Sequence, residues 1–328
     1  MAASSFNHES TLSTDLMACL GREDIADMHL IGTDGVKVPA FRSILACRSD
    51  VFCKMLLGNF EESSSNEVEL DYDSNVLKAV VEFCITDNVL EFGRFANRTG
   101  ETGVRTIVQL IACAHFLNMP VLQNIAELLA NATLSTPRNY LACAIYDEAF
   151  IYGEPTESAK LGALSIIRSH PEFCLLFRAT KFQGKTATES TSVDSNDLPA
   201  PLRYIAKTDT MKDQDPFVLE VPGVLFLRAD ALRELISDDF FMACEEYKEI
   251  TLLSALNEWA TVGGDIDFTC SLSLEPTEDR MGFAKDLAST HFRLSSIKPS
   301  QLIGVVRKSR SGIISRERTR RSIFTEAV

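Results

Sequence analysis

The N-terminal part of the chain switches between helical and strand-like spacings of its apolar residues. Leu12, Leu16 and Leu20 recur at every fourth position and form one face of a predicted first helix. Thr33-Asp34-Gly35 then separates two short apolar stretches. This pattern predicts a β-hairpin, because glycine readily adopts the positive φ that a tight turn requires.

Helical spacing returns after the hairpin. Ser49 is a good N-cap for a helix with an apolar face behind it. Residues 67–70 (EVEL) alternate as a short strand, and either Asp73 or Ser74 can cap the helix that follows. Residues 93–103 (GRFANRTGETG) are largely polar and are predicted to form a loop.

The remainder of the chain is predicted to be mostly helical. Apolar spacing and end signals place helices at 104–118, at about 120–132, from Thr136-Pro137 to Gly153, and at about 156–169, 228–237, 245–261 and 299–307. Residues 183–215 contain few large apolar side chains and are predicted to be a disordered or loosely held insert. Residues 263–280 are predicted to be an acidic loop.

The composition limits the classes of partner. A chain of 328 residues is typical of about two domains. Its formal net charge of −14 gives no overall attraction for nucleic acids or anionic membranes. The start has no signal-peptide pattern, and no run approaches the roughly 20 apolar residues that span a bilayer. We therefore expect a soluble protein with no membrane or direct nucleic-acid partner.

The cysteines and histidines show no catalytic or metal-binding pattern. The nine cysteines are odd in number and include no CxxC pair, which is typical of reduced thiols in the cytoplasm or nucleus. Cys113 and His115 are two positions apart and would face different sides of a helix. Without a convergent nucleophile, base and oxyanion site, we expect no enzyme activity, no metal and no cofactor.

Residues 24–92 resemble a BTB/POZ domain. The residues that carry the resemblance are DIADMHLIGTDGVKVPAFRSILACRSDVFCKML, then FEES, then NEVELDYDSNVLKAVVEFCITDNV. Phe41 departs from the family, which usually has histidine at this position. The resemblance implies an α+β domain over 23–119, with a short mixed sheet flanked by helices, preceded by an N-terminal segment and first helix over 1–22.

Two later stretches, 120–177 and 223–310, resemble the BACK domain that often follows BTB. They include TPRNYLACAIYDEAFIYG, LRADALRELISDDFFMACEEYKEITLLSALNEWA and FRLSSIKPSQLIGVVRKSRSGII. The resemblance implies an all-α, BACK-like domain over 120–310, interrupted by the insert. Residues 311–328 form a basic tail, which is either a nuclear localisation or docking signal or a solvated terminus.

The resemblance also implies a function. BTB proteins form homodimers that serve as substrate adaptors for cullin-3 ubiquitin ligases, and a hydrophobic-x-Glu motif contacts cullin. Phe60 and Glu62 match this motif, and Met55 on the preceding helix is a further candidate. The alternative is that Phe60 folds back onto its own helix. No kelch repeat or MATH domain accompanies the resemblance, so the substrate protein stays unidentified.

The same resemblance implies the dimer interface. Asp27 and Arg42 match a charged pair found there, although Asp27 could instead cap local backbone while Arg42 stays solvated. Leu12, Leu16 and Leu20 would belong to a helix exchanged in the dimer, or to an ordinary packed helix. The alternative function is a cullin-independent BTB scaffold in a transcriptional or signalling assembly.

Overall fold

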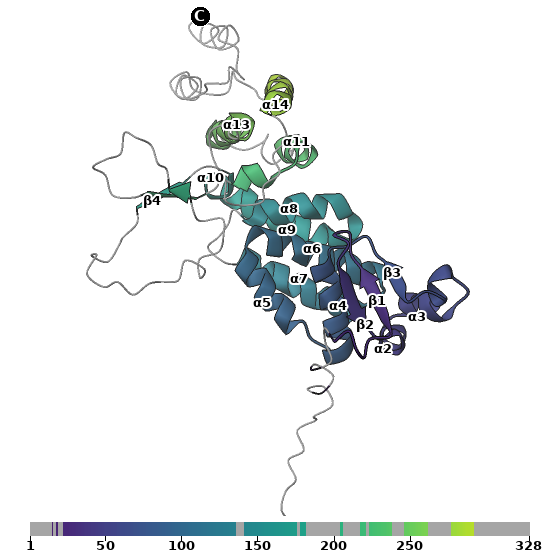
Figure 1. The fold of residues 1–328 in the computed structure, drawn as a ribbon. Coiled ribbons are helices and arrows are strands. Elements are labelled where there is room, and N and C mark those ends of the chain that lie inside the picture. The colour runs from purple at the N-terminus through teal and green to yellow at the C-terminus, as the bar shows by residue number, and fades with distance from the viewer. Residues whose placement is uncertain are drawn as a thin grey trace, which may run out of the picture. The chain divides into compact units, whose positions relative to one another are not determined.

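The chain divides into two compact units, which are described separately (Figure 1). The computed structural model describes residues 15, 18, 22–135, 141–175, 178–181, 204–205, 217–220, 223–237, 246–261 and 277–291. Unit 1 comprises residues 1–97, 102–130 and 152–156, and unit 2 comprises 98–101, 131–151 and 157–328. None of the described helices combines the length and apolar character needed to cross a membrane.

A three-stranded mixed sheet forms one side of unit 1. Its strands are β1 (Met28–Ile31), β2 (Lys37–Ala40) and β3 (Glu67–Glu69), in the order β2-β1-β3. β1 pairs antiparallel with β2 and parallel with β3. Gly35, in the predicted hairpin turn, has a φ of +71°. The hairpin, the short strand and the mixed sheet are therefore confirmed.

Helices complete unit 1, and most of them were predicted. They are α2 (Arg42–Arg48), α3 (Asp50–Leu57), the short 3-10 helix η1 (Glu61–Ser63), α4 (Ser74–Thr86), α5 (Leu90–Thr99), α6 (Glu101–Phe116), α7 (Pro120–Leu134) and the 3-10 helix η2 (Glu154–Thr156). Residues 98–99, 101 and 131–134 of these helices belong to unit 2. α4 lies against the sheet (Figure 1). The inner face of the sheet buries Met28, Leu30 and Val68. The α+β class predicted for this part of the chain is confirmed.

Two predicted N-caps fix the starts of helices. The Ser49 hydroxyl accepts a hydrogen bond from the Phe52 N–H at 3.2 Å and donates one to the Leu117 carbonyl at 2.6 Å. Ser49 thus caps α3 and also ties it to the residue that follows α6. Asp73 caps α4 by accepting the Asn75 N–H at 2.8 Å.

The loop predicted over 93–103 is wrong. Leu90–Thr99 form α5, and α6 begins at Glu101. The N-terminal N–H groups of α5 are capped from α4, because the buried Glu82 carboxylate accepts hydrogen bonds from Glu91 at 2.9 Å and Phe92 at 3.3 Å. A capping residue this far along the chain leaves no local signal at the start of the helix.

Unit 2 is mostly helical, as predicted. Its elements are α8 (Leu141–Tyr152, of which Tyr152 belongs to unit 1), α9 (Glu157–Ser169), α10 (Pro171–Leu175), the 3-10 helix η4 (Gly223–Phe226), α11 (Ala229–Ser237), α13 (Glu246–Thr261) and α14 (Thr277–His291). Gly153, with a φ of +66°, follows α8 at the predicted end. Trp259 is buried, and its indole N–H donates to the Leu227 carbonyl at 2.9 Å.

Buried acids and a single arginine join two helices of unit 2. Asp147 and Glu148 lie on α8 and are both buried. Asp147 accepts the Arg228 main-chain N–H at 2.7 Å, and the Arg228 guanidinium lies 3.2 Å from the Glu148 carboxylate. Since Arg228 immediately precedes α11, these contacts hold the start of α11 against α8.

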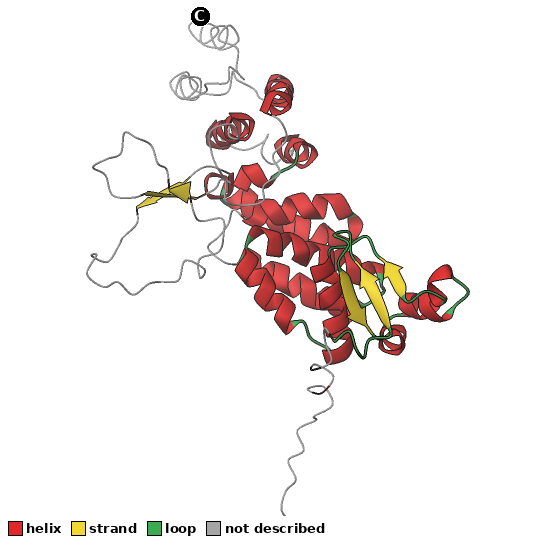
Figure 2. Ribbon diagram, in the orientation of Figure 1, coloured by secondary structure: helices red, strands yellow, loops and turns green. Residues whose placement is uncertain are grey.

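Unit 2 also contains elements that the sequence did not predict. β4 (Arg178–Lys181), β5 (Tyr204–Ile205) and β6 (Phe217–Glu220) form a small antiparallel sheet in the order β4-β6-β5 (Figure 2). β5 lies inside the 183–215 insert, so Tyr204 and Ile205 form a short strand within the segment that was predicted to be disordered or loosely held. The acidic loop predicted over 263–280 is wrong for its last residues, because α14 begins at Thr277.

Several predicted features lie outside the described residues. They are Leu12, Leu16 and Leu20 of the first helix, the Thr136-Pro137 helix start, most of the 183–215 insert, the 299–307 helix and the basic tail. These remain predictions.

Replacing Glu82 by glutamine tests the cap of α5. Glu82→Gln removes the charge that accepts two N–H groups, so we expect unit 1 to lose about 1–3 kcal/mol of unfolding free energy. Urea unfolding followed by circular dichroism measures this loss. Glu91→Gln is the control, because its exposed ion pair with Arg94 contributes at most about 0.5 kcal/mol. Equal free energies of unfolding for the two variants would contradict the capping role of Glu82.

Candidate protein-binding surface

The candidate surface lies in the segment that joins α3 to β3. α3 ends at Leu57, and Phe60 occupies the N-cap position of η1, which covers Glu61–Ser63. Ser63 closes this turn, because its N–H donates to the Phe60 carbonyl at 3.1 Å and its hydroxyl donates to the same oxygen at 2.7 Å. The backbone around the predicted motif is therefore a hydrogen-bonded turn.

Gly58 lies at the end of α3, where the chain leaves the helix and leads into the turn at Phe60. Its N–H donates to the Lys54 carbonyl at 2.9 Å. A Cβ at this position would overlap the same carbonyl oxygen and would lie 3.4 Å from Cδ2 of the Phe60 ring. The absence of a side chain at Gly58 thus sets both the end of α3 and the space available to Phe60.

Phe60 is exposed. Its side chain is 59% accessible, and Leu57, at the end of α3, is 63% accessible. Met55 and Glu62 are half-buried, and Glu61 is exposed. The predicted residues Met55, Phe60 and Glu62 therefore lie in one short stretch of chain, with an exposed apolar ring among acidic neighbours. Leu57 is an exposed apolar residue of the same stretch that the motif did not include.

Arg42 contacts the same segment from α2. Its Nη1 donates to the Leu56 carbonyl at 3.2 Å and to the Ser63 carbonyl at 3.3 Å. It also lies 3.5 Å from the Glu62 carbonyl, and Nη2 donates to the Ser65 carbonyl. The guanidinium is half-buried. A sequence motif could not show this contact, because Arg42 lies 14 to 23 positions before its partners.

Asp27 and Arg42 meet through the backbone of Arg42. The exposed Asp27 carboxylate accepts the Arg42 main-chain N–H at 2.8 Å. Phe41, at the N-cap position of α2, makes no side-chain capping hydrogen bond. Asp27 thus caps α2 in place of Phe41. The assignment of both residues to a dimer interface is not tested by these contacts.

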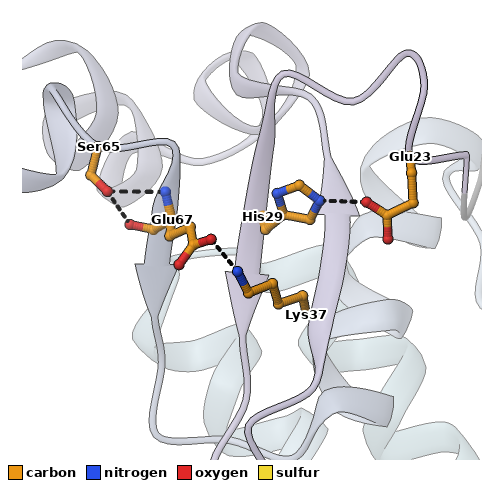
Figure 3. Close-up of polar contacts among 5 residues, drawn as sticks. All are labelled: Glu23, His29, Lys37, Ser65 and Glu67. Carbon is orange, nitrogen blue, oxygen red and sulfur yellow. Dashed lines mark hydrogen bonds and ion pairs between the residues drawn. The ribbon is translucent and has the colours of Figure 1, made fainter.

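The far end of the segment leads into the outer face of the sheet (Figure 3). The Ser65 hydroxyl accepts the Glu67 N–H at 3.0 Å and donates to the Glu67 carbonyl at 2.8 Å. The Glu67 carboxylate forms an ion pair with Lys37 of β2, and His29 of β1 lies 2.7 Å from the Glu23 carboxylate. The hydrogen bond from Lys37 lowers the pKa of Glu67, and desolvation acts in the opposite direction. The outer face of this sheet is therefore charged.

The buried thiols in the described residues are poorly suited to nucleophilic chemistry. Burial raises the pKa of Cys84 to about 12 and raises the pKa of Cys113 and Cys143 as well. A nucleophilic cysteine requires the thiolate form near neutral pH. Across the part of the chain that the structure describes, no three His, Cys, Asp or Glu side chains are grouped to hold a metal ion.

The arrangement of the sheet, α2, α3 and the later helices agrees with one known domain family. A family model for the BTB/POZ domain matches residues 16–133. Residues 16–133 form a BTB/POZ domain. BTB domains mediate protein–protein interactions and often dimerise, so this region is a protein-interaction module. A search of curated proteins finds no match to this chain.

Replacing Gly58 by alanine tests the close packing at the end of α3. The added methyl group must displace the Lys54 carbonyl, so we expect Gly58→Ala to destabilise the BTB domain by about 1–3 kcal/mol. Gly93→Ala is the matched control in α5, where the nearest atom is 3.9 Å away. Since glycine is unfavourable inside a helix, the control should gain about 0.5–1 kcal/mol. A change of the melting temperature in the same direction in both variants would contradict the close packing at Gly58.

The Glu67–Lys37 ion pair predicts a pH dependence. Because the folded-state pKa of Glu67 is lowered, the pair stabilises the fold above the unfolded pKa, and this contribution is lost as pH falls through the folded pKa. In Lys37→Met we expect the titration midpoint of the Glu67 carboxyl, measured by NMR, to move up towards that of an ordinary glutamate. His29→Gln should raise it less. An unchanged midpoint in Lys37→Met would show that Lys37 does not set this pKa.

Proposed function

We propose that this protein is a dimeric substrate adaptor for a cullin-3 ubiquitin ligase. The observation that carries the proposal is the exposed Phe60 ring, 59% accessible, within a BTB domain and two positions before Glu62. Large aromatic residues that become buried on association contribute much of the binding energy at protein interfaces. Phe60 could either bind a partner or fold back onto its own helix, and its exposure supports the binding role.

The acidic residues around Phe60 support partner selection. Glu61 is exposed, and Glu62 is half-buried beside it. Charges at an interface favour the correct partner and orientation more than they add raw affinity. In this proposal Phe60 supplies the apolar anchor, Glu62 supplies a charged contact that fixes orientation, and Met55 packs beneath the interface.

The remaining parts of the proposal concern dimerisation and the target. The dimer would form through the first helix with Leu12, Leu16 and Leu20, together with Asp27 and Arg42. The helices of unit 2 would belong to a BACK-like domain that holds an unidentified substrate protein. Such an adaptor performs no chemistry and acts by raising the effective concentration of the target near the ligase.

Binding to the purified N-terminal region of cullin-3 tests the proposal. We expect Phe60→Ala to weaken binding at least about 30-fold, as expected for a central aromatic anchor. Glu62→Ala should have a smaller effect that is reduced further by added salt. Calorimetry gives the affinities, and size-exclusion chromatography checks that each variant keeps the oligomeric state of the unaltered protein.

Leu128→Ala is the matched control for the loss of an exposed apolar side chain. Leu128 lies on α7 of the same BTB domain and is 68% accessible. Its replacement should leave cullin-3 affinity unchanged. If the unaltered, folded dimer bound no cullin-3, the adaptor role would be excluded and a cullin-independent BTB scaffold would become the better explanation.

A further inference from the structure

We infer that Arg42 is a positioning residue that sets the conformation of the Phe60–Ser65 segment and so presents the candidate binding surface. The inference starts from the four main-chain carbonyls that its guanidinium contacts: those of Leu56, Glu62, Ser63 and Ser65. These carbonyls belong to the end of α3, to η1 and to the second residue after η1. A single side chain thus joins the three pieces of backbone that surround Phe60.

The chemistry of the guanidinium suits this position. The carbonyls in the last turn of a helix have no partner within the helix, and Leu56 is in the last turn of α3. A cation at a helix C-terminus is stabilised by these carbonyls. Arginine presents five N–H donors in a rigid plane, so one guanidinium can contact several diverging oxygens.

The contacts of Arg42 are transmitted directly to Phe60. The guanidinium holds the Ser63 carbonyl, and the Ser63 N–H and hydroxyl both hold the Phe60 carbonyl. Two residues further along, the Ser65 N–H donates to the Glu62 carbonyl at 3.3 Å. Fixing Ser63 and Ser65 therefore fixes the backbone that carries Phe60 and Glu62, while the Phe60 ring stays exposed.

A preordered segment lowers the entropy that must be lost when a partner binds. This consequence rests on the proposed function, because it assumes that Phe60 and Glu62 contact a partner. The ordering of the segment does not rest on the proposed function, since it depends on hydrogen bonds within the chain. The two can therefore be tested by separate measurements.

Arg42→Lys is the decisive variant, because it keeps the charge. A lysine ammonium is a compact point charge with three donors and cannot span the same set of carbonyls as the planar fork. Arg48→Lys is the matched control. Arg48 is the last residue of α2. It forms an ion pair with Asp87 and lies over the Phe83 ring, so its described contacts are outside the Phe60–Ser65 segment.

Amide hydrogen exchange measures the ordering in the purified full-length chain. In Arg42→Lys we expect the amides of Ser63, Ser64 and Ser65 to exchange about tenfold faster than in the unaltered protein. Amides in the core helix α6, such as that of Leu110, should keep their rates, which separates a local effect from general destabilisation. Arg48→Lys should leave all these amides unchanged. Cullin-3 binding by Arg42→Lys should weaken several-fold with the oligomeric state retained.

Each result has a defined meaning. Unchanged exchange at Ser63–Ser65 in Arg42→Lys would overturn the inference, and so would faster exchange without any loss of cullin-3 affinity in a protein that binds cullin-3. If the unaltered protein bound no cullin-3, the proposed function would fail, while a segment-specific rise in exchange would still support the positioning role. If Arg42→Lys did not fold, NMR of the Arg42 guanidinium in the unaltered protein would decide: slowed rotation and exchange of its N–H groups support the inference, and free rotation overturns it.

Discussion

Main-chain carbonyls that lack a partner within regular secondary structure constrain the segment that carries Phe60. Between Leu56 and Ser65 the chain leaves a helix, turns and starts a strand, so its carbonyls cannot all be paired within regular structure. An unpaired buried polar group costs about 1–3 kcal/mol. Arg42 supplies the donors from α2. The conformation of the exposed segment therefore depends on a residue that precedes it by many positions.

The fold could be predicted wherever the signals were local. The hairpin turn at Gly35 and the cap Ser49 depend on residues next to the elements they define, and both were predicted. Asp73 was one of the two caps predicted for α4. α5 was missed because its cap, Glu82, belongs to the preceding helix. The β4-β6-β5 sheet was missed because Tyr204–Ile205 pair with residues 218–219, and such a short strand has no detectable period of its own.

The candidate site also has features that the sequence predicted and features that it did not. Phe60 and Glu62 could be found from the sequence because the motif is contiguous and sits at a recognisable place in a BTB domain. The exposure of Phe60 could not be found, since the accessibility of a residue depends on the folded chain around it and not on the motif itself. The carbonyl contacts of Arg42 could not be found either, because its partners lie 14 to 23 positions further along the chain.

Three carboxylates show how charge is used in the described parts of both units. Asp27, Glu82 and Asp147 each accept a main-chain N–H at the start of a helix that follows them in the sequence: α2, α5 and α11. Each carboxylate thus supplies an acceptor to an N–H group that has no partner within its own helix. Glu82 and Asp147 are buried, whereas Glu61 and the Phe60 ring face solvent. The three capping carboxylates thus order the backbone at the starts of helices, while Phe60 and Glu61 stay accessible at the surface.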